Sequence, residues 1–350
     1  MLASESSKEL IPIHIVTGFL GSGKTTLLNQ LLQQPEMQNT IVIINEFGEI
    51  SVDHLLIETT TEDMMILEGG CVCCAIRTDL LNTLEELFHK RDRQEINEFK
   101  QIVVETTGLA DPAPILRTLI NDQFVATYYR LDTIVTTVDA VYAIQQSTEY
   151  DESVKQIALA NHLILTKIDL VNDNDLDILI SHLEQINPTA KLHKVNLQKQ
   201  HLKATDLFDN EHYDKQTQQL DINHWLKVES HTNHIHNTYI RTFCIEHQEP
   251  LHWLTLEHWI QQLTRLRGKD LLRVKGIAYT YETDLPVIIQ GVQHIFQPPT
   301  TLKAWPDDKR CSQIVFITRS IEKQLVEKVL QAIINSKNSV DICNAALLLL

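Results

Sequence analysis

The sequence predicts an α/β protein in which a doubly wound, mostly parallel sheet is followed by a smaller α+β domain. Short runs rich in Ile and Val are apolar at successive positions, as strands covered on both faces must be. Amphipathic stretches with helical spacing separate these runs over the first two hundred residues. Beyond residue 238 strands follow one another, with a helix only after the first and the last, which is typical of an antiparallel sheet.

The first domain is expected to contain seven strands, each only a few residues long. Leucines at helical spacing predict one helix that includes Leu27 to Leu32 and another that includes Leu80 to Phe88. In chain order, the expected strands cover residues 11–17, 40–45, 64–67, 101–105, 133–138, 162–166 and 191–196.

The second domain is expected to combine one sheet with two helices. Its strands are expected over residues 239–246, 271–281, 286–296 and 313–317, and its helices over 252–267 and 321–334. The apolar stripe of the first helix is expected to face the core and consists of Leu254, Leu256, Trp259, Ile260 and Leu263. The resulting domain limits are 9–205 for the first domain, 206–237 for a polar, His-containing linker, 238–335 for the second domain and 336–350 for a tail.

Composition excludes several classes of protein. The 350 residues suffice for two domains with a substantial core. A formal net charge of −16 disfavours nucleic acid and anionic membranes as partners. No apolar run is long enough to span a membrane, and the first residues lack a secretory signal pattern. We therefore expect a cytoplasmic protein whose cysteines are thiols or metal ligands.

Residues 18–25, GFLGSGKT, match the phosphate-binding pattern G-x-x-x-x-G-K-[ST] between an expected strand and an expected helix. Glycines let backbone N–H groups curl around phosphates, and a helix N-terminus adds partial positive charge. Lys24 is expected to reach the β- and γ-phosphates, and the Thr25 hydroxyl to bind Mg²⁺. The other expected nucleotide-binding residues of this segment are Gly18, Gly21, Ser22, Gly23 and Thr26.

A second pattern concerns the base of the nucleotide. Thr166, Lys167 and Asp169 come at the end of an expected strand. A carboxylate at Asp169 accepts hydrogen bonds from both guanine N1–H and the 2-amino group, a pair of donors that adenine lacks. The pattern favours GTP, although the usual guanine-reading sequence begins with Asn, and Thr166 lacks that amide.

Five segments, in this order, resemble the CobW-type family of P-loop GTPases. They are residues 18–25, 45–49 (NEFGE), 70–74 (GCVCC), 105–108 (ETTG) and 166–169 (TKID). Residues 272–276 and 290–293, with Trp305, are similar to the C-terminal domain of that family. The resemblance covers nearly the whole chain and implies a GTPase that delivers or inserts metals such as zinc, cobalt, nickel or iron.

Three cysteines lie within four positions, and the resemblance implies that they bind metal. Cys71, Cys73 and Cys74 do not form the two separate C-x-x-C pairs of a structural zinc finger, which favours an open site suited to transfer. Zn²⁺ fits such thiolates, with Co²⁺ or Ni²⁺ as alternatives, and a fourth position is left for Glu46, water or a client's ligand. The alternative is that one or two of these cysteines are small buried hydrophobes.

The linker histidines offer a weaker signal for metal. His234 and His236 share one face of an extended chain, and His231 and His234 share one face of a helix, so an auxiliary metal site is one interpretation. Polar filler in a surface loop is the favoured one.

Residues 105–108 end an expected strand where P-loop proteins place a Mg²⁺-linked carboxylate and a glycine that senses the γ-phosphate. Glu105 is the expected Mg²⁺ ligand, directly or through water, and Gly108 is expected to contact the nucleotide. Lys24, Glu46 and Glu105 are the candidate catalytic residues. Glu46, Glu105 and Asp111 remain alternatives for orienting the attacking water.

Residues 45–49 follow the second expected strand, at the edge where a doubly wound sheet presents ligands. A segment at this place is ordered by γ-phosphate and Mg²⁺ and released on hydrolysis, so its movement would give the GTP and GDP states different metal affinities. The sequence therefore predicts a slow GTP-hydrolysing metallochaperone that hands a metal to a client metalloprotein. The alternatives are a nucleotide-regulated metal buffer and a P-loop small-molecule kinase.

Overall fold

The computed structural model of the chain describes two compact units. The first contains the residues up to Ala143, with Ala160–Asn172 and Lys191–Asn210; the second contains Ile144–Leu159, Asp173–Ala190 and the C-terminal sheet. Backbone and side chains are described for residues 10–44, 80–197, 199, 202–208, 240–293, 296, 299–306 and 310–335, and the backbone alone for 45–47, 64–69, 74–79 and 295.

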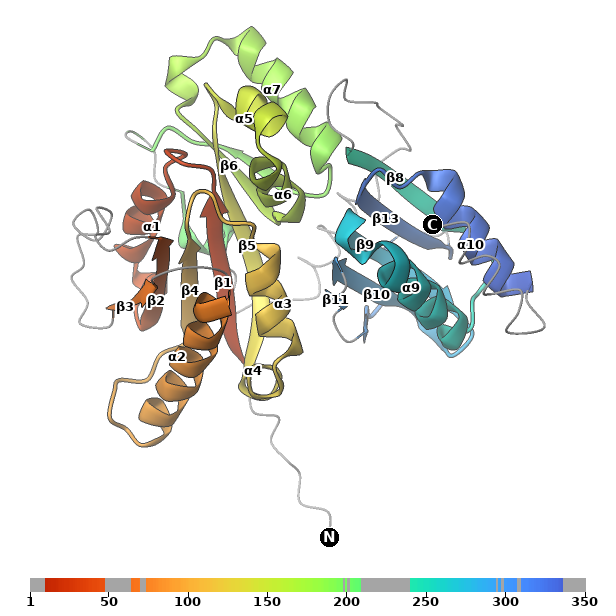
Figure 1. Cartoon of the computed structure of the whole chain (residues 1–350), viewed down its shortest axis with the longest axis horizontal. Helices are drawn as coiled ribbons and strands as arrows, with labels where there is room; N and C mark the ends of the chain where they lie inside the picture. Colours follow the sequence, from red (N-terminus) through yellow and green to blue (C-terminus); the bar gives the residue numbers. More distant parts are fainter. Residues whose placement is uncertain are drawn as a thin grey trace. The chain divides into compact units, whose positions relative to one another are not determined.

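The first unit is built on a seven-stranded sheet in which every pairing between neighbouring strands is parallel (Figure 1). The order across the sheet is β3-β2-β4-β1-β5-β6-β7. The strands are β1 Ile11–Gly18, β2 Thr40–Phe47, β3 Met64–Gly69, β4 Gln101–Thr106, β5 Tyr129–Asp139, β6 His162–Thr166 and β7 Lys191–Lys194. Since β2 to β4 lie on one side of β1 and β5 to β7 on the other, the strand order reverses at β1, where doubly wound sheets bind their ligands.

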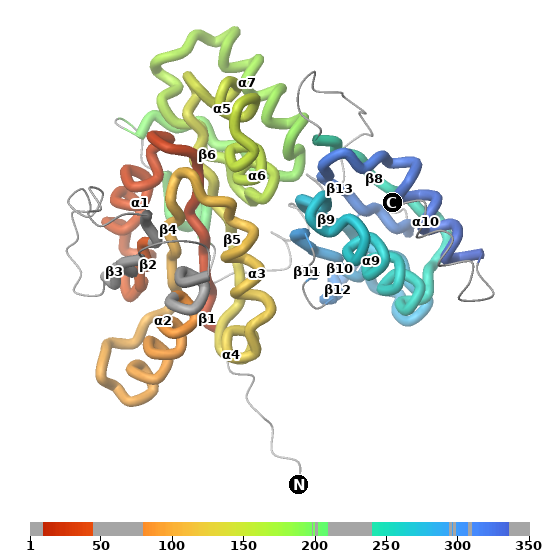
Figure 2. The backbone as a smooth tube through the Cα atoms, in the orientation of Figure 1, coloured from red at the N-terminus to blue at the C-terminus, as the bar shows by residue number. Residues whose placement is uncertain are grey.

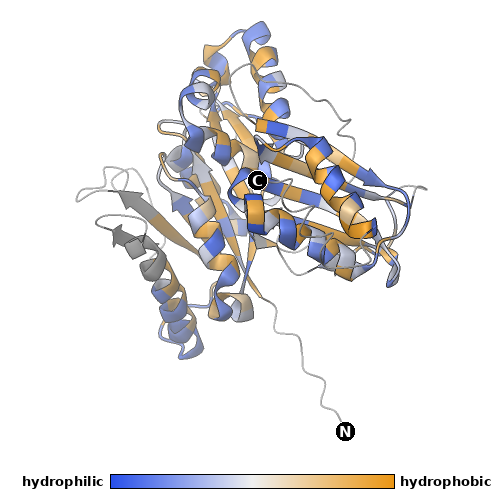
Figure 3. Cartoon of the chain, turned by 45° about the vertical axis from the view of Figure 1, so that its right-hand side comes forward, coloured by the Kyte–Doolittle hydropathy of each residue, from blue (hydrophilic) through white to orange (hydrophobic). Residues whose placement is uncertain are grey.

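Helices cover both faces of this sheet, which confirms the predicted doubly wound fold. On one face, α1 (Lys24–Leu32) buries Leu27, Leu28 and Leu31 against Val16 and its neighbours. The opposite face carries α2 (Cys74–Asp92), α3 (Ala113–Asn121) and α4 (Gln123–Tyr128) (Figure 1). Figure 3 shows the hydrophobic colouring concentrated along the central strands, as the apolar runs of the sequence predict.

The face beneath α1 also buries residues that follow β7. Leu207 and Phe208 come directly after the 3₁₀ helix Ala204–Asp206 and are only 2% and 3% exposed. The sequence places them in the linker, because they begin a polar stretch, but here they extend the core. Residues 209–237 of the expected linker and the tail 336–350 lie outside the described residues, and the domain limits stay a prediction.

The sheet of the second unit is antiparallel, with the order β11-β10-β9-β13-β8 and β12 paired to β10. This arrangement confirms the predicted α+β domain. Its strands are β8 Ile240–His247, β9 Leu271–Thr280, β10 Thr283–Val292, β11 Ile295–Phe296, β12 Thr300–Thr301 and β13 Ser312–Arg319. Helices α9 (Trp253–Arg267) and α10 (Lys323–Asn335) pack on one face of the sheet. Helix α6 (Asp151–Leu159) contacts β9, and helix α7 (Asp173–Ile186) contacts β8. Helix α5 spans Ala143–Glu149.

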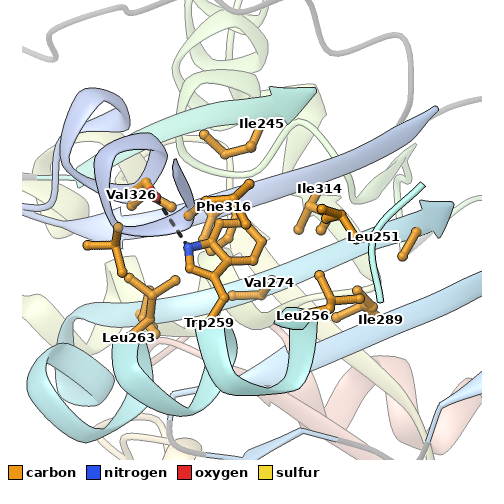
Figure 4. Close-up of a cluster of buried hydrophobic side chains, with 14 of the residues drawn as sticks. Ile245, Leu251, Leu256, Trp259, Leu263, Val274, Ile289, Ile314, Phe316 and Val326 are labelled. Carbon is orange, nitrogen blue, oxygen red and sulfur yellow. Dashed lines mark hydrogen bonds between the residues drawn. The ribbon is translucent and has the colours of Figure 1, made fainter. Parts of the chain in front are cut away.

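Trp259 lies at the centre of the core between this sheet and its two helices (Figure 4). The ring is fully buried, and its Nε1–H donates to the Val326 carbonyl at 3.2 Å. Replacing so large a buried side chain by Ala costs about 3–5 kcal/mol. Leu256 and Leu263 are buried as the predicted stripe requires, whereas Leu254 is 75% exposed, because it lies on the solvent side of the first turn of α9.

The expected strand over residues 286–296 divides into two. Strand β10 ends at Val292, Gln293 takes a left-handed conformation with φ 53°, and β11 returns antiparallel to β10. The Phe296 ring lies where a Cβ on Gly291 would stand, since that Cβ would be 2.5 Å from a ring carbon. Apolar residues occur on both sides of the turn, at 287–289 and at 295–296, so the sequence pattern predicts one strand.

Within the described residues, no helix combines the length and the apolar character needed to cross a bilayer.

Candidate nucleotide and metal site

The phosphate-binding segment connects β1 to α1 at the point where the strand order reverses (Figure 2). Its glycines adopt conformations that a side chain would strain. Gly18, Gly21 and Gly23 have φ values of 142°, 70° and 94°. Gly18 is also tightly enclosed, because a Cβ there would stand 2.3 Å from Thr137 Oγ1 and 2.5 Å from the Thr137 carbonyl oxygen.

Lys24 begins α1 and folds back over this segment. Its ammonium group donates to the carbonyl oxygens of Gly18 at 3.1 Å and Phe19 at 3.2 Å. The first N–H groups of α1 have no partner within the helix, so they and the ammonium group provide positive potential at one place. Ser22 is buried and Thr26 is exposed at the same helix end. This arrangement fits the phosphates of a nucleotide.

Thr25 and Glu105 come together from different elements. The Thr25 hydroxyl, at the start of α1, donates to Glu105 Oε1 at 3.0 Å. Glu105 lies on β4, which neighbours β1 in the sheet, and the residue is only 5% exposed. A hydroxyl and a carboxylate are the oxygen ligands that Mg²⁺ prefers, so this pair fits the predicted Mg²⁺ site.

Gly108 lies directly against the phosphate-binding segment. A Cβ at Gly108 would stand 2.7 Å from Leu20 Cδ2 and 2.8 Å from both the Cα and the N of Leu20. The residue is therefore fixed by a close approach between two backbones rather than by a special φ. Asp111 has a structural role, because its Oδ1 accepts from the Ala113 N–H at 3.0 Å and so holds the beginning of α3.

A set of threonine hydroxyls supports the segment from below. Thr106 donates to the Thr17 hydroxyl at 2.7 Å, and the hydroxyls of Thr137 and Ser22 lie 2.6 Å apart. Thr166 donates to the Ser22 carbonyl at 2.8 Å. Sequence reasoning assigned no role to the first three threonines. The signal was present, because a threonine lies at or near the carboxyl end of each of four central strands.

The expected base-reading residues lie at the end of β6. Lys167 has a left-handed backbone conformation with φ 55°, and its ammonium group pairs with the buried Asp139 at the end of β5. Asp139 also accepts from the Val141 N–H at 2.9 Å, which fixes the carboxylate. Asp169 is exposed in the 3₁₀ helix Ile168–Leu170. Asp139 was not identified from the sequence, because it belongs to no segment that resembles the family.

Most of the expected metal-binding residues lie outside the described side chains. Cys71 and Cys73 lie outside the described residues, and Cys74 and Glu46 are described only in their backbones, at the start of α2 and in β2. Among the described residues, no group of three or more His, Cys, Asp or Glu side chains is arranged to hold a metal ion. The linker residues His231, His234 and His236 also lie outside the described residues.

The backbone nevertheless places β2, which carries Glu46, next to β3 and β4. Strand β2 lies between β3 and β4, with Phe47 in register with Gly69 and Ile44 in register with Glu105. Glu46 therefore lies on the strand between β4, which carries Glu105, and β3, which ends at Gly69, two residues before Cys71 in the sequence.

Residues 12–194 match the nucleotide-binding domain of the CobW/HypB/UreG family, which is just over half of the chain. The chain belongs to this family. Residues 240–334 match the C-terminal domain of the cobalamin synthesis protein CobW. The resemblance predicted from the five motif segments is thus confirmed over both domains.

Relatives with curated names agree with this assignment. The zinc chaperone YjiA of Escherichia coli is 30% identical over 307 residues, which cover 88% of this chain and 93% of that protein. The zinc-regulated GTPase metalloprotein activator 1 of Dictyostelium discoideum is 28% identical over 318 residues, covering 79% of this chain and 64% of that protein. The crystal structure of the Zn(II)-bound YjiA GTPase from E. coli matches with a TM-score of 0.67 and 25% identity, over 91% of this chain and 97% of that one.

Proposed function

We propose that this protein is a GTP-hydrolysing metallochaperone that binds zinc and delivers it to client metalloproteins. The observation that carries the proposal is the convergence of Lys24 and the Thr25–Glu105 pair on one phosphate-binding segment, in a chain whose relatives are named zinc chaperones and zinc-regulated GTPases. GTP and Mg²⁺ are the proposed cofactors, and zinc is the cargo, with cobalt or nickel as competitors.

Each described residue of the site has a proposed part in nucleotide binding. Backbone N–H groups of residues 18–26 hold the phosphates, Lys24 neutralises their charge, and Asp169 reads the guanine edge with Lys167 beside it. Thr25 and Glu105 hold Mg²⁺, which when bound neutralises charge between the β- and γ-phosphates. Gly108 keeps the end of β4 against the segment that binds the γ-phosphate.

Hydrolysis needs a group that orients water, and Glu46 and Glu105 are the proposed candidates. Asp111 is less suited, because its carboxylate already holds the first turn of α3. No described arginine is proposed as a catalytic finger, so the expected intrinsic hydrolysis is slow, as in GTPases that depend on a partner for this charge.

Zinc binding is proposed at Cys71, Cys73 and Cys74, with Glu46 as the fourth group. Strand β2 lies between β3, which ends two residues before Cys71 in the sequence, and β4, which carries Glu105, and this order supports a mechanical connection between nucleotide and metal. By thermodynamic reciprocity, if GTP changes the zinc affinity, zinc changes the GTP affinity by the same factor.

A steady-state assay with GTP and with ATP, in Mg²⁺ and with or without one equivalent of Zn²⁺, tests this function. We expect slow turnover of GTP but not of ATP, with equal amounts of GDP and free phosphate. A phosphorylated small molecule in place of free phosphate would indicate a kinase instead. Zinc binding without any nucleotide turnover would indicate a metal buffer.

A further inference from the structure

Two helices of the nucleotide-binding family segment pack within the second unit. Helices α6 and α7 lie inside residues 12–194, yet they group with the C-terminal sheet and contact its strands β9 and β8. Between these helices, the chain passes through β6 and the base-reading residues 166–169, which belong to the first unit. The segment that reads the base is therefore joined at both ends to helices held by the C-terminal sheet.

Arg273 holds the end of the first of these helices. It lies on β9, is only 7% exposed, and its Nη1 donates to the carbonyl oxygen of Leu159, the last residue of α6. Burial lowers the pKa of this guanidinium to about 10, so the group stays charged at neutral pH. A cation at a helix C-terminus interacts favourably with the helix dipole and satisfies a carbonyl that has no partner within the helix.

The end of the second helix is held in a similar way. The Thr242 hydroxyl on β8 lies 3.2 Å from the carbonyl oxygens of both Gln185 and Ile186, at the end of α7. The Asn187 side chain then connects α7 to α6, since its Nδ2 donates to the Ile157 carbonyl at 2.8 Å and to the Ala158 carbonyl at 3.1 Å. The C-terminal sheet thus fixes the ends of both helices through two side chains, Arg273 and Thr242, and Asn187 connects the two helices to each other.

We propose that Arg273 is a positioning residue for recognition of the guanine base, acting through α6 and β6 on Asp169. The proposal rests on the function proposed above. Only two residues, Ala160 and Asn161, separate the helix end that Arg273 holds from the start of β6. Asn161 is fixed in turn, because its Oδ1 accepts from the Ile134 N–H at 3.1 Å.

The expected effect on guanine binding comes from the free energy needed to order the base-reading segment. If the end of α6 is released, the base-reading segment samples more conformations before the nucleotide binds, and binding must remove that freedom. The loss falls on contacts with the base. The phosphate-binding segment has further support that does not come from β6, since the hydroxyls of Thr17, Thr106 and Thr137 hold it beside the hydrogen bond from Thr166 to the Ser22 carbonyl.

The test compares Arg273→Met with the unaltered protein by measuring dissociation constants for GDP and for inosine diphosphate, which lacks only the 2-amino group. We expect GDP to bind roughly tenfold more weakly in the variant, within the usual range of coupling between sites. Inosine diphosphate should weaken less, so that the preference for guanine shrinks. Arg273→Lys, which keeps one cationic donor, should restore part of the preference.

Arg241→Met is the matched control, because Arg241 lies on the same sheet but its side chain pairs with Glu322 at 3.0 Å. It should leave both constants unchanged. Thr242→Val provides a second test at a half-buried position, at the end of α7, and it should reduce the guanine preference in the same direction. If Arg273→Met does not fold, Arg273→Lys decides the matter, because its shorter cationic side chain should bind GDP more weakly than Arg273 does while inosine diphosphate changes less.

Equal weakening of GDP and inosine diphosphate, or unchanged binding of both in folded variants, would overturn the proposal. These outcomes differ from failure of the proposed function, in which the unaltered protein would bind neither GDP nor GTP.

Discussion

Gly108→Ala tests whether the end of β4 controls the phosphate-binding segment. The added Cβ would stand 2.8 Å from two backbone atoms of Leu20, whereas ordinary van der Waals contacts begin at 3.4 Å. One of the two backbones must therefore move by about 0.6 Å, and overpacking of this kind typically costs about 1–3 kcal/mol. If that cost falls on the nucleotide-binding conformation, the affinity for GTP falls by about 5- to 150-fold.

The assay is a titration of the variant with GDP and with a nonhydrolysable GTP analogue, accompanied by urea unfolding to measure the stability of the free protein. A Leu20→Ala substitution on the variant background is the control. It removes the Cδ2 contact at 2.7 Å but leaves the contacts with the Cα and N of Leu20. Leu20 is 53% exposed, so this change alone should cost little.

We expect the double variant to bind nucleotide as weakly as Gly108→Ala. If Gly108→Ala binds both nucleotides with the affinity of the unaltered protein, the close approach of the two backbones does not contribute to nucleotide binding. If Leu20→Ala restores binding, only a flexible side chain was in the way, and the reasoning from the backbone is wrong.

The remaining predictions concern charge, packing and titration. Glu105→Gln should weaken Mg²⁺-dependent GTP binding by about tenfold, because hydrogen bonds with charged groups contribute about 1.5–3 kcal/mol. The affinity for GDP without Mg²⁺ should stay unchanged or increase. Isothermal titration in Mg²⁺ and in EDTA measures both affinities. Gly18→Ala should lower the free energy of unfolding by about 3 kcal/mol or more, because a Cβ would overlap Thr137 at a φ that favours glycine, and urea unfolding measures it. Burial lowers the pKa of His182. The stability that the neutral ring contributes is therefore complete above the unfolded pKa of about 6.5 and is lost as the pH falls through the lower, folded pKa. His182→Gln should reduce this loss of stability at acid pH, as unfolding curves measured at several pH values would show. Burial raises the pKa of the Cys244 thiol to about 12, so iodoacetamide at about pH 8 should modify Cys244 only after unfolding, as mass spectrometry of its peptide would show.

Much of the fold follows from the sequence because a strand covered on both faces must be apolar at every position. The seven runs of the first domain correspond to β1 to β7, and β6 has the predicted bounds. The pattern fails at two places, at a turn within an expected strand and at the beginning of a polar stretch. Gln293 turns the chain by its left-handed conformation, and Leu207 and Phe208 are core residues at the beginning of a polar stretch.

The nucleotide site divides in the same way. Residues predicted to bind a ligand through a local segment, such as Lys24 and Thr25, are recognisable from their spacing alone. Residues that act by supporting that segment from other strands are not, because their contacts depend on the order of the strands. Thr137 and Asp139 belong to this second group, since Thr137 is 115 residues from Ser22 and Asp139 is 28 residues from Lys167. The placement of the cysteine side chains remains a prediction.

Zinc affinity measured in two nucleotide states tests the central claim most directly. The protein would be titrated with Zn²⁺ without oxygen, in the presence of Mg²⁺ with either a GTP analogue or GDP, beside a variant with Cys71, Cys73 and Cys74 replaced by Ala. We expect zinc affinities that differ by about tenfold or more between the two nucleotide states, and we expect the variant to lose that difference. Equal zinc affinity in both states of the unaltered protein would contradict it.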